Sequence, residues 1–251
     1  MSYSWSYSAF STALTCLRKF QYVYIDKLTP EYNSADLAFG SALHLALNAC
    51  LTGGSGEEVF TTYWQTFKYT DLVYGRYKWT DLETIGLQFV AKFQKYYVKR
   101  FKVHTAEVRL FAEYRGIKFE GTMDLLAEFD AVMTLVDFKT TSAKYEPDKA
   151  KVSLQLYLYA YLCITSLKVT PAQIMYLPFI KGTGGIQTPV IEIFKEADMY
   201  RALDQMVDYL LLAKSPAEDL SPMNYNSCYA YGRKCEFWAA CHGKDSEEGS
   251  A

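Results

Sequence analysis

Apolar positions recur at helical spacing through the first hundred residues, in four segments separated by short polar breaks. The segment 7–28 repeats aromatic and aliphatic residues, and 34–50 is apolar almost all round, as a buried helix is. The segments 57–69 and 80–102 follow the Gly-rich stretch "LTGGSGEE". The pattern therefore predicts four helices in this N-terminal part.

The apolar period changes to two from Thr105 onward. Three alternating stretches follow one another, "AEVRLFAEY", "IKFEGTMDLLAEF" and "VMTLVDFKT". The short turn sequences "RG" and "DA" separate them. Alternating strands joined by such short turns predict an antiparallel meander at the centre of the fold.

Helical spacing returns in 151–166 and again in 195–214. Between these two predicted helices, 172–180 and 188–194 have the apolar character of strands around a Gly-rich turn. The end of the chain is irregular and rich in cysteine, and the polar tail 244–251 is expected to be disordered.

No internal repeat or linker divides the chain, and 251 residues suffice for one large domain. We therefore expect a single domain over 1–243. It would comprise a helical part (1–103), a core (104–214) and a Cys-rich segment (225–243).

Composition excludes several classes of protein. No apolar run approaches the roughly 20 residues that span a bilayer, and "MSYSWSYSAF" lacks the basic and apolar regions of a signal peptide. We therefore expect a cytoplasmic protein without a membrane partner. Because the net charge is −2, a polyanion would have to be held by a local basic patch or through metal ions.

Asp137 and Lys139 lie two residues apart in "LVDFKTT", so a strand would project both from one face. Asp124, at the end of "GTMD", precedes Asp137 by a spacing that allows a turn and a return strand. Adjacent carboxylates repel unless a proton or cation lies between them, and oxygen ligands favour Mg²⁺ or Mn²⁺. Lys139 beside such an ion could orient an attacking water or stabilise charge on a phosphate.

The ordinary alternative is a surface ion pair between Asp137 and Lys139 on an edge strand, with Asp124 capping a turn. Alone, D-x-K is a weak pattern. The apolar run before Asp137 favours a buried strand, and buried strands rarely carry unpaired charge.

Six cysteines in a reduced compartment are not expected to form structural disulfides. Cys50 and Cys163 lie inside apolar helical patterns and are interpreted as core residues. Cys228, Cys235 and Cys241 lie close together near the end, so three thiols could share one metal centre and leave a fourth position open.

The motifs "GTMD", "VDFKTT" and "QLYLY", in this order, resemble those of the PD-(D/E)XK nuclease superfamily. Within it, the chain is similar to the RecB-type branch, which includes CRISPR-associated exonucleases. The resemblance implies an α/β fold with a restriction-endonuclease-like core, a mixed central sheet flanked by helices. It also implies an N-terminal helical region and a C-terminal Cys-rich iron-sulfur segment.

The resemblance assigns Asp124 and Asp137 as metal-binding carboxylates and Lys139 as the catalytic lysine. Gln155 and Tyr159 match the family's Q-x-x-x-Y motif. Residues four apart share one helix face, so the two could contact the substrate or hold the active-site strand. Packing of this helix face on the sheet is the alternative.

His44 matches the branch's G-x-x-x-H motif, with Gly40 four residues before it, which implies an additional metal ligand. Without the motif, a lone histidine in an apolar helix would be read as a core residue. Glu107 lies where the family has a glutamate on its first strand, and is given a supporting role at the metal; exposure to solvent is the alternative.

Cys16 matches the branch's N-terminal cysteine, which implies a [4Fe-4S] cluster held by Cys16, Cys228, Cys235 and Cys241. The six residues between Cys228 and Cys235 depart from the shorter gap that is frequent in the family. A Zn²⁺ site suits the same four thiolates, and a set of unligated thiols is a third reading.

The resemblance implies a Mg²⁺- or Mn²⁺-dependent DNA exonuclease that acts on single-stranded ends in recombination, repair or viral DNA processing. Basic and aromatic residues interleave in "AKFQKYYVKRFK" and "RKF", as in grooves that hold single strands. A structure-specific or nicking endonuclease and a noncatalytic binding subunit are the alternatives. A separate helicase or recombination partner is expected, in bacterial cytoplasm or, for a viral protein, in host cytoplasm.

Overall fold

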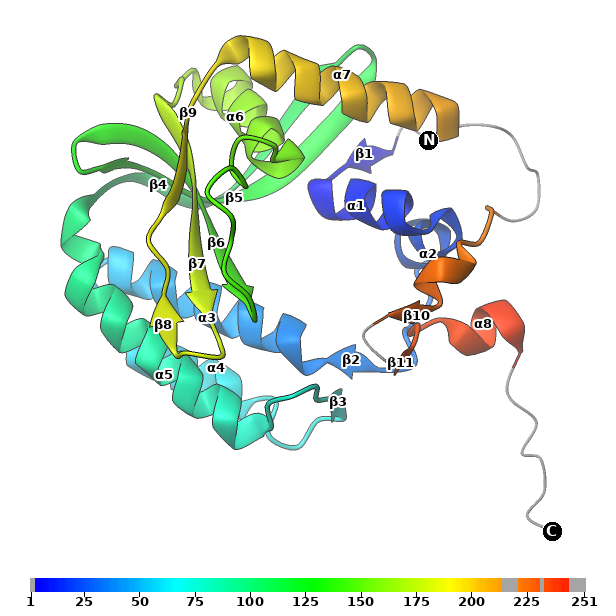
Figure 1. Cartoon of the computed structure of the whole chain (residues 1–251), viewed down its shortest axis with the longest axis horizontal. Helices are drawn as coiled ribbons and strands as arrows, with labels where there is room; N and C mark the ends of the chain where they lie inside the picture. Colours follow the sequence, from blue (N-terminus) through cyan, green and yellow to red (C-terminus); the bar gives the residue numbers. More distant parts are fainter. Residues whose placement is uncertain (1–2, 214–220, 231–232, 244–251) are drawn as a thin grey trace.

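The computed structural model describes residues 3–213, 221–230 and 233–243, so the tail 244–251 lies outside the described residues. Within this part of the chain, seven strands form one mixed central sheet (Figure 1). β4, β5 and β6 form the predicted antiparallel meander, and β7 runs parallel to β6. β8 and β9 pair antiparallel with β7, and β1 pairs parallel with β5. The strands are β1 (Ser4–Trp5), β4 (Phe101–Tyr114), β5 (Ile117–Phe129), β6 (Val132–Thr141), β7 (Gln173–Ile180), β8 (Gly185–Ile186) and β9 (Val190–Ile193).

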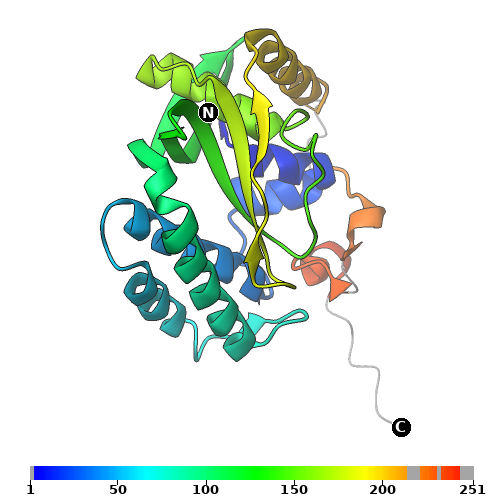
Figure 2. The ribbon, with the colours of Figure 1, turned by 60° about the vertical axis from the view of Figure 1, so that its left-hand side comes forward.

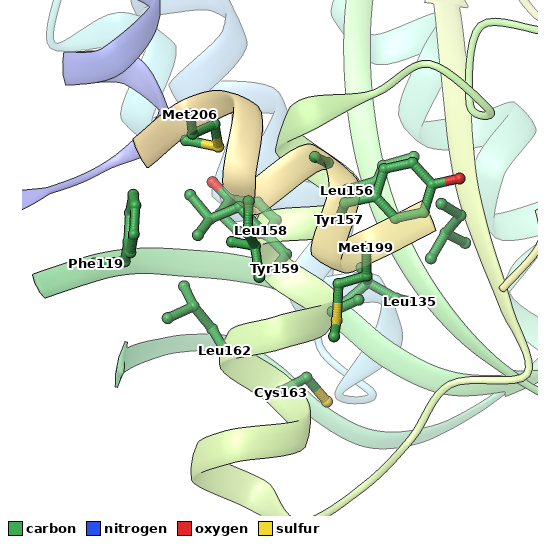
Figure 3. Close-up of a cluster of buried hydrophobic side chains, with 14 of the residues drawn as sticks. Phe119, Leu135, Leu156, Tyr157, Leu158, Tyr159, Leu162, Cys163, Met199 and Met206 are labelled. Atoms are coloured by element: carbon green, nitrogen blue, oxygen red, sulfur yellow. The ribbon is translucent and has the colours of Figure 1, made fainter. Parts of the chain in front are cut away.

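Helices cover both faces of this sheet, as Figures 1 and 2 show. α3, α4 and α5 enclose one hydrophobic core against the sheet, and α6 and α7 enclose the other. In Figure 3, Leu158 and Leu162 of α6 lie close to Phe119 of β5, in the second core. The arrangement confirms an α/β fold with a mixed sheet between helical layers. The helices are α3 (Ala35–Leu51), α4 (Gly56–Gln65), α5 (Trp79–Tyr96), α6 (Leu154–Leu167) and α7 (Glu196–Ala213).

The N-terminal helices and the end of the chain lie side by side (Figure 1). Asn224 donates a side-chain hydrogen bond to the carbonyl oxygen of Thr15, and Arg18 donates one to that of Ser221. The elements concerned are α1 (Tyr7–Thr15), α2 (Leu17–Phe20), a π-helical turn (Gln21–Ile25), a 3₁₀ turn (Tyr225–Ser227), β10 (Tyr229–Ala230), β11 (Arg233–Lys234) and α8 (Trp238–His242).

Three of the expected helices differ from those observed, and the one expected over 57–69 already ends at Gln65. The helix expected over 7–28 is interrupted at Cys16, whose backbone is extended with φ −163° and ψ 116°. The helix expected over 80–102 is wrong at its end, because a 3₁₀ turn follows Tyr96 and β4 begins at Phe101. Phe101 pairs in register with Phe129, with ring centroids 4.9 Å apart, and this pairing between distant residues overrides helical spacing.

Several short elements had no sequence signal. β1 and β8 join the central sheet, while β2 (Asn33–Ser34) pairs in parallel with β3 (Leu72–Val73).

Cys50 and Cys163 are buried in the two cores, as expected. Among the described residues, no helix combines the length and apolar character needed to cross a membrane.

The contact between α4 and α5 depends on Gly86. A Cβ atom there would overlap the buried ring of Phe60. We expect Gly86→Ala to lower the free energy of unfolding by about 1–3 kcal/mol, because two helices would have to move apart. Urea unfolding measures this. Gly75→Ala, with no atom within 4 Å of the added Cβ, is the control, and equal midpoints for the two variants would contradict the expectation.

Candidate active site

The candidate site lies where β5 and β6 separate. The last register pair between these strands is Leu125 with Val136, so Asp124 and Asp137 are the next residue on each. Beyond this point β1 takes the position beside β5. Oδ2 of Asp124 accepts a hydrogen bond from the backbone nitrogen of Phe138 at 2.8 Å. The carboxylate thus satisfies a buried N–H where the strand pairing ends.

His44 reaches this fork from α3. Its Nδ1 lies 3.3 Å from Oδ1 of Asp124, and its Nε2 lies 3.1 Å from the carbonyl oxygen of Phe138. Gly40 lies one turn earlier, and a Cβ atom there would make ordinary van der Waals contact with Oγ1 of Thr140 at 3.8 Å. Burial lowers the pKa of His44, but the charge of Asp124, the hydrogen bond to it and the charge of Asp137 together outweigh burial, and the pKa rises to about 9. His44 is therefore part of the group of side chains at the point where β5 and β6 separate.

Glu107 reaches the same position from β4. The pairing of β4 with β5 shifts register between Val103 and Thr105, and Glu107 has φ +50°, a conformation unusual for a residue with a side chain. A ligand atom from each of Glu107, His44 and Asp124 lies within 4.8 Å of the others. Burial and then the charge of Asp124 raise the pKa of Glu107. Backbone strain at such a position is typical of functional sites.

Asp137 and Lys139 project from β6 on the face opposite to Val136 and Phe138, which belong to the core under α3. Nζ of Lys139 lies 2.7 Å from Oδ2 of Asp137. This oxygen is buried and has no aligned hydrogen-bond donor, so the contact is ionic. Burial raises the pKa of Asp137 to about 6 against the opposing effect of Lys139. Burial would lower the pKa of Lys139, but Asp137 raises it, so the lysine stays charged.

Gln155 and Tyr159 share a buried face of α6, and Nε2 of Gln155 donates to the hydroxyl of Tyr159 at 3.3 Å. The ring of Tyr159 packs over Gly121 of β5, where a Cβ would lie 2.6 Å from it. Burial raises the pKa of Tyr159 to about 12, with Asp137 the next cause. The pair therefore supports the strand that carries Asp124. In the described part of the chain, neither residue forms a hydrogen bond with Asp124, Asp137 or Lys139.

Three residues beside Lys139 were not expected at the site. Tyr176 of β7 pairs in register with Asp137, and its ring centroid lies 6.0 Å from Nζ of Lys139. Its hydroxyl lies 2.5 Å from Oγ of Ser153, and the ring of Tyr145 packs edge-on at 5.4 Å. Only Ser153, which caps α6, had a sequence signal, because the register of a parallel strand pair cannot be read from sequence.

The donor set fits a hard divalent cation. One solvent-open cleft is lined by His44, Glu107 and Asp124 together with Lys139. Carboxylate oxygens suit Mg²⁺ or Mn²⁺, and imidazole suits transition metals. The buried Oδ2 of Asp137, which lacks an aligned donor, is an additional oxygen beside this group. The expected metal ligands were His44, Asp124 and Asp137. In the structure, Glu107 joins His44 and Asp124 in one cluster of ligand atoms, whereas Asp137 forms an ion pair with Lys139.

We expect Glu107→Gln to weaken Mn²⁺ binding by at least about 10-fold, because a neutral amide replaces one of the clustered ligands. Isothermal titration calorimetry of the metal-free protein measures the affinity. Glu113→Gln is the matched control, since Glu113 is exposed on the same strand. Equal affinities in the two variants would show that Glu107 is not a ligand.

The four cysteines predicted to act together line one cavity, which also contains His242. β10 and β11 pair antiparallel, and the backbone nitrogen of Cys235 donates to the carbonyl oxygen of Cys228 at 2.8 Å. The hairpin therefore brings Cys228 and Cys235 together despite the six residues between them. On the other side, the backbone nitrogen of Asn224 lies 3.5 Å from Sγ of Cys16.

The cysteine cavity is small. Its volume is about 20 Å³, room for roughly one water molecule. Among the described residues, no three of these sulfur atoms lie within 4.8 Å of one another. Four thiols around one cavity are the donor type of a thiolate-ligated metal centre, and the sulfur atoms would have to move closer together to share a single ion.

Comparison with known proteins gives a family match over most of the chain. The family model described as the PD-(D/E)XK nuclease superfamily matches residues 4–242. A crystal structure named as a putative exonuclease from Eubacterium rectale superposes with a TM-score of 0.58 and 15% identity, over 83% of this chain and 79% of that one. The structure of SSO0001 matches with a TM-score of 0.30 and 18% identity, over 57% of this chain and 61% of that one, and supports no argument on fold. No curated protein matches the chain.

Proposed function

Because the chain belongs to the PD-(D/E)XK nuclease superfamily, we propose that it is a metal-dependent exonuclease that hydrolyses DNA phosphodiester bonds from single-stranded ends. The observation that carries the proposal is the fork of β5 and β6, where Asp124 and Asp137 are adjacent and Lys139 pairs with Asp137. The likeness to a protein named as a putative exonuclease supports cleavage from ends. Membership of the RecB-type branch remains part of the proposal.

In this proposal, His44, Glu107, Asp124 and Asp137 hold Mg²⁺ or Mn²⁺, which supplies Lewis-acid stabilisation of charge on the phosphate. Lys139 stays protonated beside Asp137 and offers a positive charge to the same phosphate. The ion pair with Asp137 holds the ammonium group of Lys139 in one position before the substrate binds. Gln155 and Tyr159 act indirectly, by holding β5 through the contact of Tyr159 with Gly121.

The cysteine cavity supports a second part of the proposal. Cys16, Cys228, Cys235 and Cys241 would hold a [4Fe-4S] cluster that ties the N-terminal helices to the end of the chain. The β10–β11 hairpin supports this, because it brings Cys228 next to Cys235 although six residues separate them in the sequence. Zn²⁺ is the second candidate, favoured by the small cavity volume. Absorbance in the visible range together with iron and zinc analysis distinguishes them.

The nuclease proposal is tested with end-labelled linear DNA and covalently closed circular DNA, each with Mg²⁺, Mn²⁺ or EDTA. An exonuclease degrades only the linear form, and EDTA stops it. Cleavage of circles would support a structure-specific or nicking endonuclease. Binding of DNA without any cleavage would support a noncatalytic subunit and overturn the proposed activity.

The pathway and partners follow from the same proposal. DNA is the expected substrate, and a separate helicase or recombination protein is the expected partner, in repair, recombination or viral DNA processing. A cytoplasmic location stays a prediction from sequence. Copurification of the tagged chain with a DNA-dependent ATPase tests the partner.

A further inference from the structure

A second groove adjoins the active-site cleft. It shares Asp36 and Leu37, in the first turn of α3, with that cleft, so the two lie next to each other at these residues. We call it the side groove. Its other lining residues come from the N-terminal part, the stretch around β3, the end of β6 and the C-terminal segment: Thr15, Lys19, Tyr32, Ser34, Val73–Arg76, Ser142, Ser227 and Arg233–Glu236.

Charge in the side groove is opposite in sign to the net charge of the protein. Four basic side chains line it against two acidic ones, whereas the whole chain carries −2. Both acids are already paired, Asp36 with Lys181 and Glu236 with Lys19. The groove is therefore a local basic surface beside a site that acts on phosphate.

Two arginines in this groove are available to an anion. Within the described residues, neither Arg76 nor Arg233 forms an ion pair with a carboxylate. Each guanidinium instead lies 5.7 Å from the centroid of an aromatic ring, Arg76 over Tyr77 and Arg233 over Tyr32. An arginine held on an aromatic face keeps its N–H groups free to contact a phosphate.

The wall formed by the C-terminal segment is anchored. The hydroxyl of Tyr32 donates to the carbonyl oxygen of Lys234 at 2.8 Å, and the backbone nitrogen of Glu31 donates to that of Glu236 at 2.9 Å. Tyr32 and Tyr74 line the groove, and Leu37, with 76% of its surface exposed, lies where groove and cleft meet. Half-buried aromatic rings and one exposed apolar side chain along a basic path suit unpaired bases, which stack on aromatic groups.

We propose that the side groove is a binding site for single-stranded nucleic acid that leads the strand to the active-site cleft. Arg76 and Arg233 contact backbone phosphates, and Tyr32 and Leu37 contact bases. The inference rests on the proposed nuclease function and adds to it a binding site outside the candidate metal site. It also gives the C-terminal segment a direct role in holding substrate.

The test measures binding of a fluorescein-labelled oligothymidylate by anisotropy, in EDTA and over a range of salt concentrations. Each phosphate contact on a single strand contributes about 0.7 to the slope of log affinity against log salt. We expect Arg76→Ala and Arg233→Ala each to reduce the slope by about 0.7, a loss of about fivefold in affinity near 0.1 M salt, and the double variant to lose both.

Two further sets of variants control for other effects. Arg201→Ala removes an arginine whose side chain is 78% exposed on α7, outside the groove, and should leave the slope unchanged. Arg76→Lys and Arg233→Lys keep the charge and should restore most of the slope. Slopes equal to wild type in both alanine variants, equal affinity for duplex and single strand, or no binding by the wild type would overturn the inference.

Failure of the proposed function would appear separately. Wild-type protein with Mn²⁺ is given the p-nitrophenyl ester of thymidine 5′-phosphate, a phosphodiester small enough to occupy the cleft alone. Hydrolysis of the ester with unchanged slopes in the arginine variants rejects the side groove and keeps the nuclease. No hydrolysis of the ester or of DNA by the wild type rejects the nuclease, whatever the slopes are.

Discussion

Lys139→Met is expected to reduce the rate of DNA cleavage by about 100- to 1,000-fold, the usual cost of losing one preorganised group that stabilises charge. The lysine is held 2.7 Å from Oδ2 of Asp137, and its pKa is raised, so it is charged before substrate binds. Methionine keeps an unbranched side chain that is one atom shorter and removes the charge. The rate is measured at a saturating concentration of labelled DNA with Mg²⁺, so that weaker DNA binding by the variant does not lower the measured rate.

The matched control is Lys144→Met, which removes an exposed lysine a few residues beyond the end of β6. Removal of Lys139 also leaves Asp137 buried without its counter-ion, which destabilises the fold. The thermal midpoint of each variant is therefore measured, and rates are compared where both are folded. A Lys139→Met enzyme that keeps a rate within about threefold of the control would remove the lysine from the mechanism.

The fork itself was predictable from sequence. A period of two fixes which residues of β6 share a face, so Asp137 and Lys139 were expected together. The connection between β5 and β6 is the two-residue turn Asp130–Ala131, with φ +48° and +67°, the positive values that a tight hairpin requires. A short turn fixes the register of both strands, and the register brings Asp124 next to Asp137.

Other parts of the site depend on contacts between distant residues, which no local pattern encodes. The pairing of β4 with β5 shifts register a few residues before Glu107, whose φ is +50°, and β1 joins a strand more than a hundred residues away. Tyr176 reaches Lys139 through the register of a parallel pair. His44 was found through its motif, yet its contact with the carbonyl of Phe138 required the structure.

The break in the N-terminal helix shows how a local prediction fails for a physical reason. Helical spacing continues through Cys16, but its backbone is extended and its sulfur lies in the cysteine cavity. Contacts with the other end of the chain, such as the 3.5 Å approach of the Asn224 nitrogen, hold it there. A tertiary contact thus outweighs the weak propensity of one residue for helix.

If the cysteine cavity holds the proposed iron or zinc centre, Cys16→Ser is expected to abolish metal binding and to lower the free energy of unfolding by on the order of 5 kcal/mol. Joining residue 16 to the C-terminal cysteines closes a loop of more than two hundred residues, and the chain-entropy estimate for such a cross-link has this size. A loss of this size is comparable to the net stability of a whole domain.

Cys50→Ser provides the matched control, because Cys50 is also buried but lies in the core under α3, away from the cavity. We expect it to lose packing energy and to keep the full metal content, whereas Cys16→Ser loses both metal and the cross-link. Metal analysis, visible absorbance and urea unfolding are measured on anaerobically purified protein. Stoichiometric metal in Cys16→Ser would contradict the four-cysteine site. Metal loss without destabilisation would contradict the cross-link estimate. It would mean that the hydrogen bonds of Asn224 and Arg18 suffice to hold the two ends of the chain together.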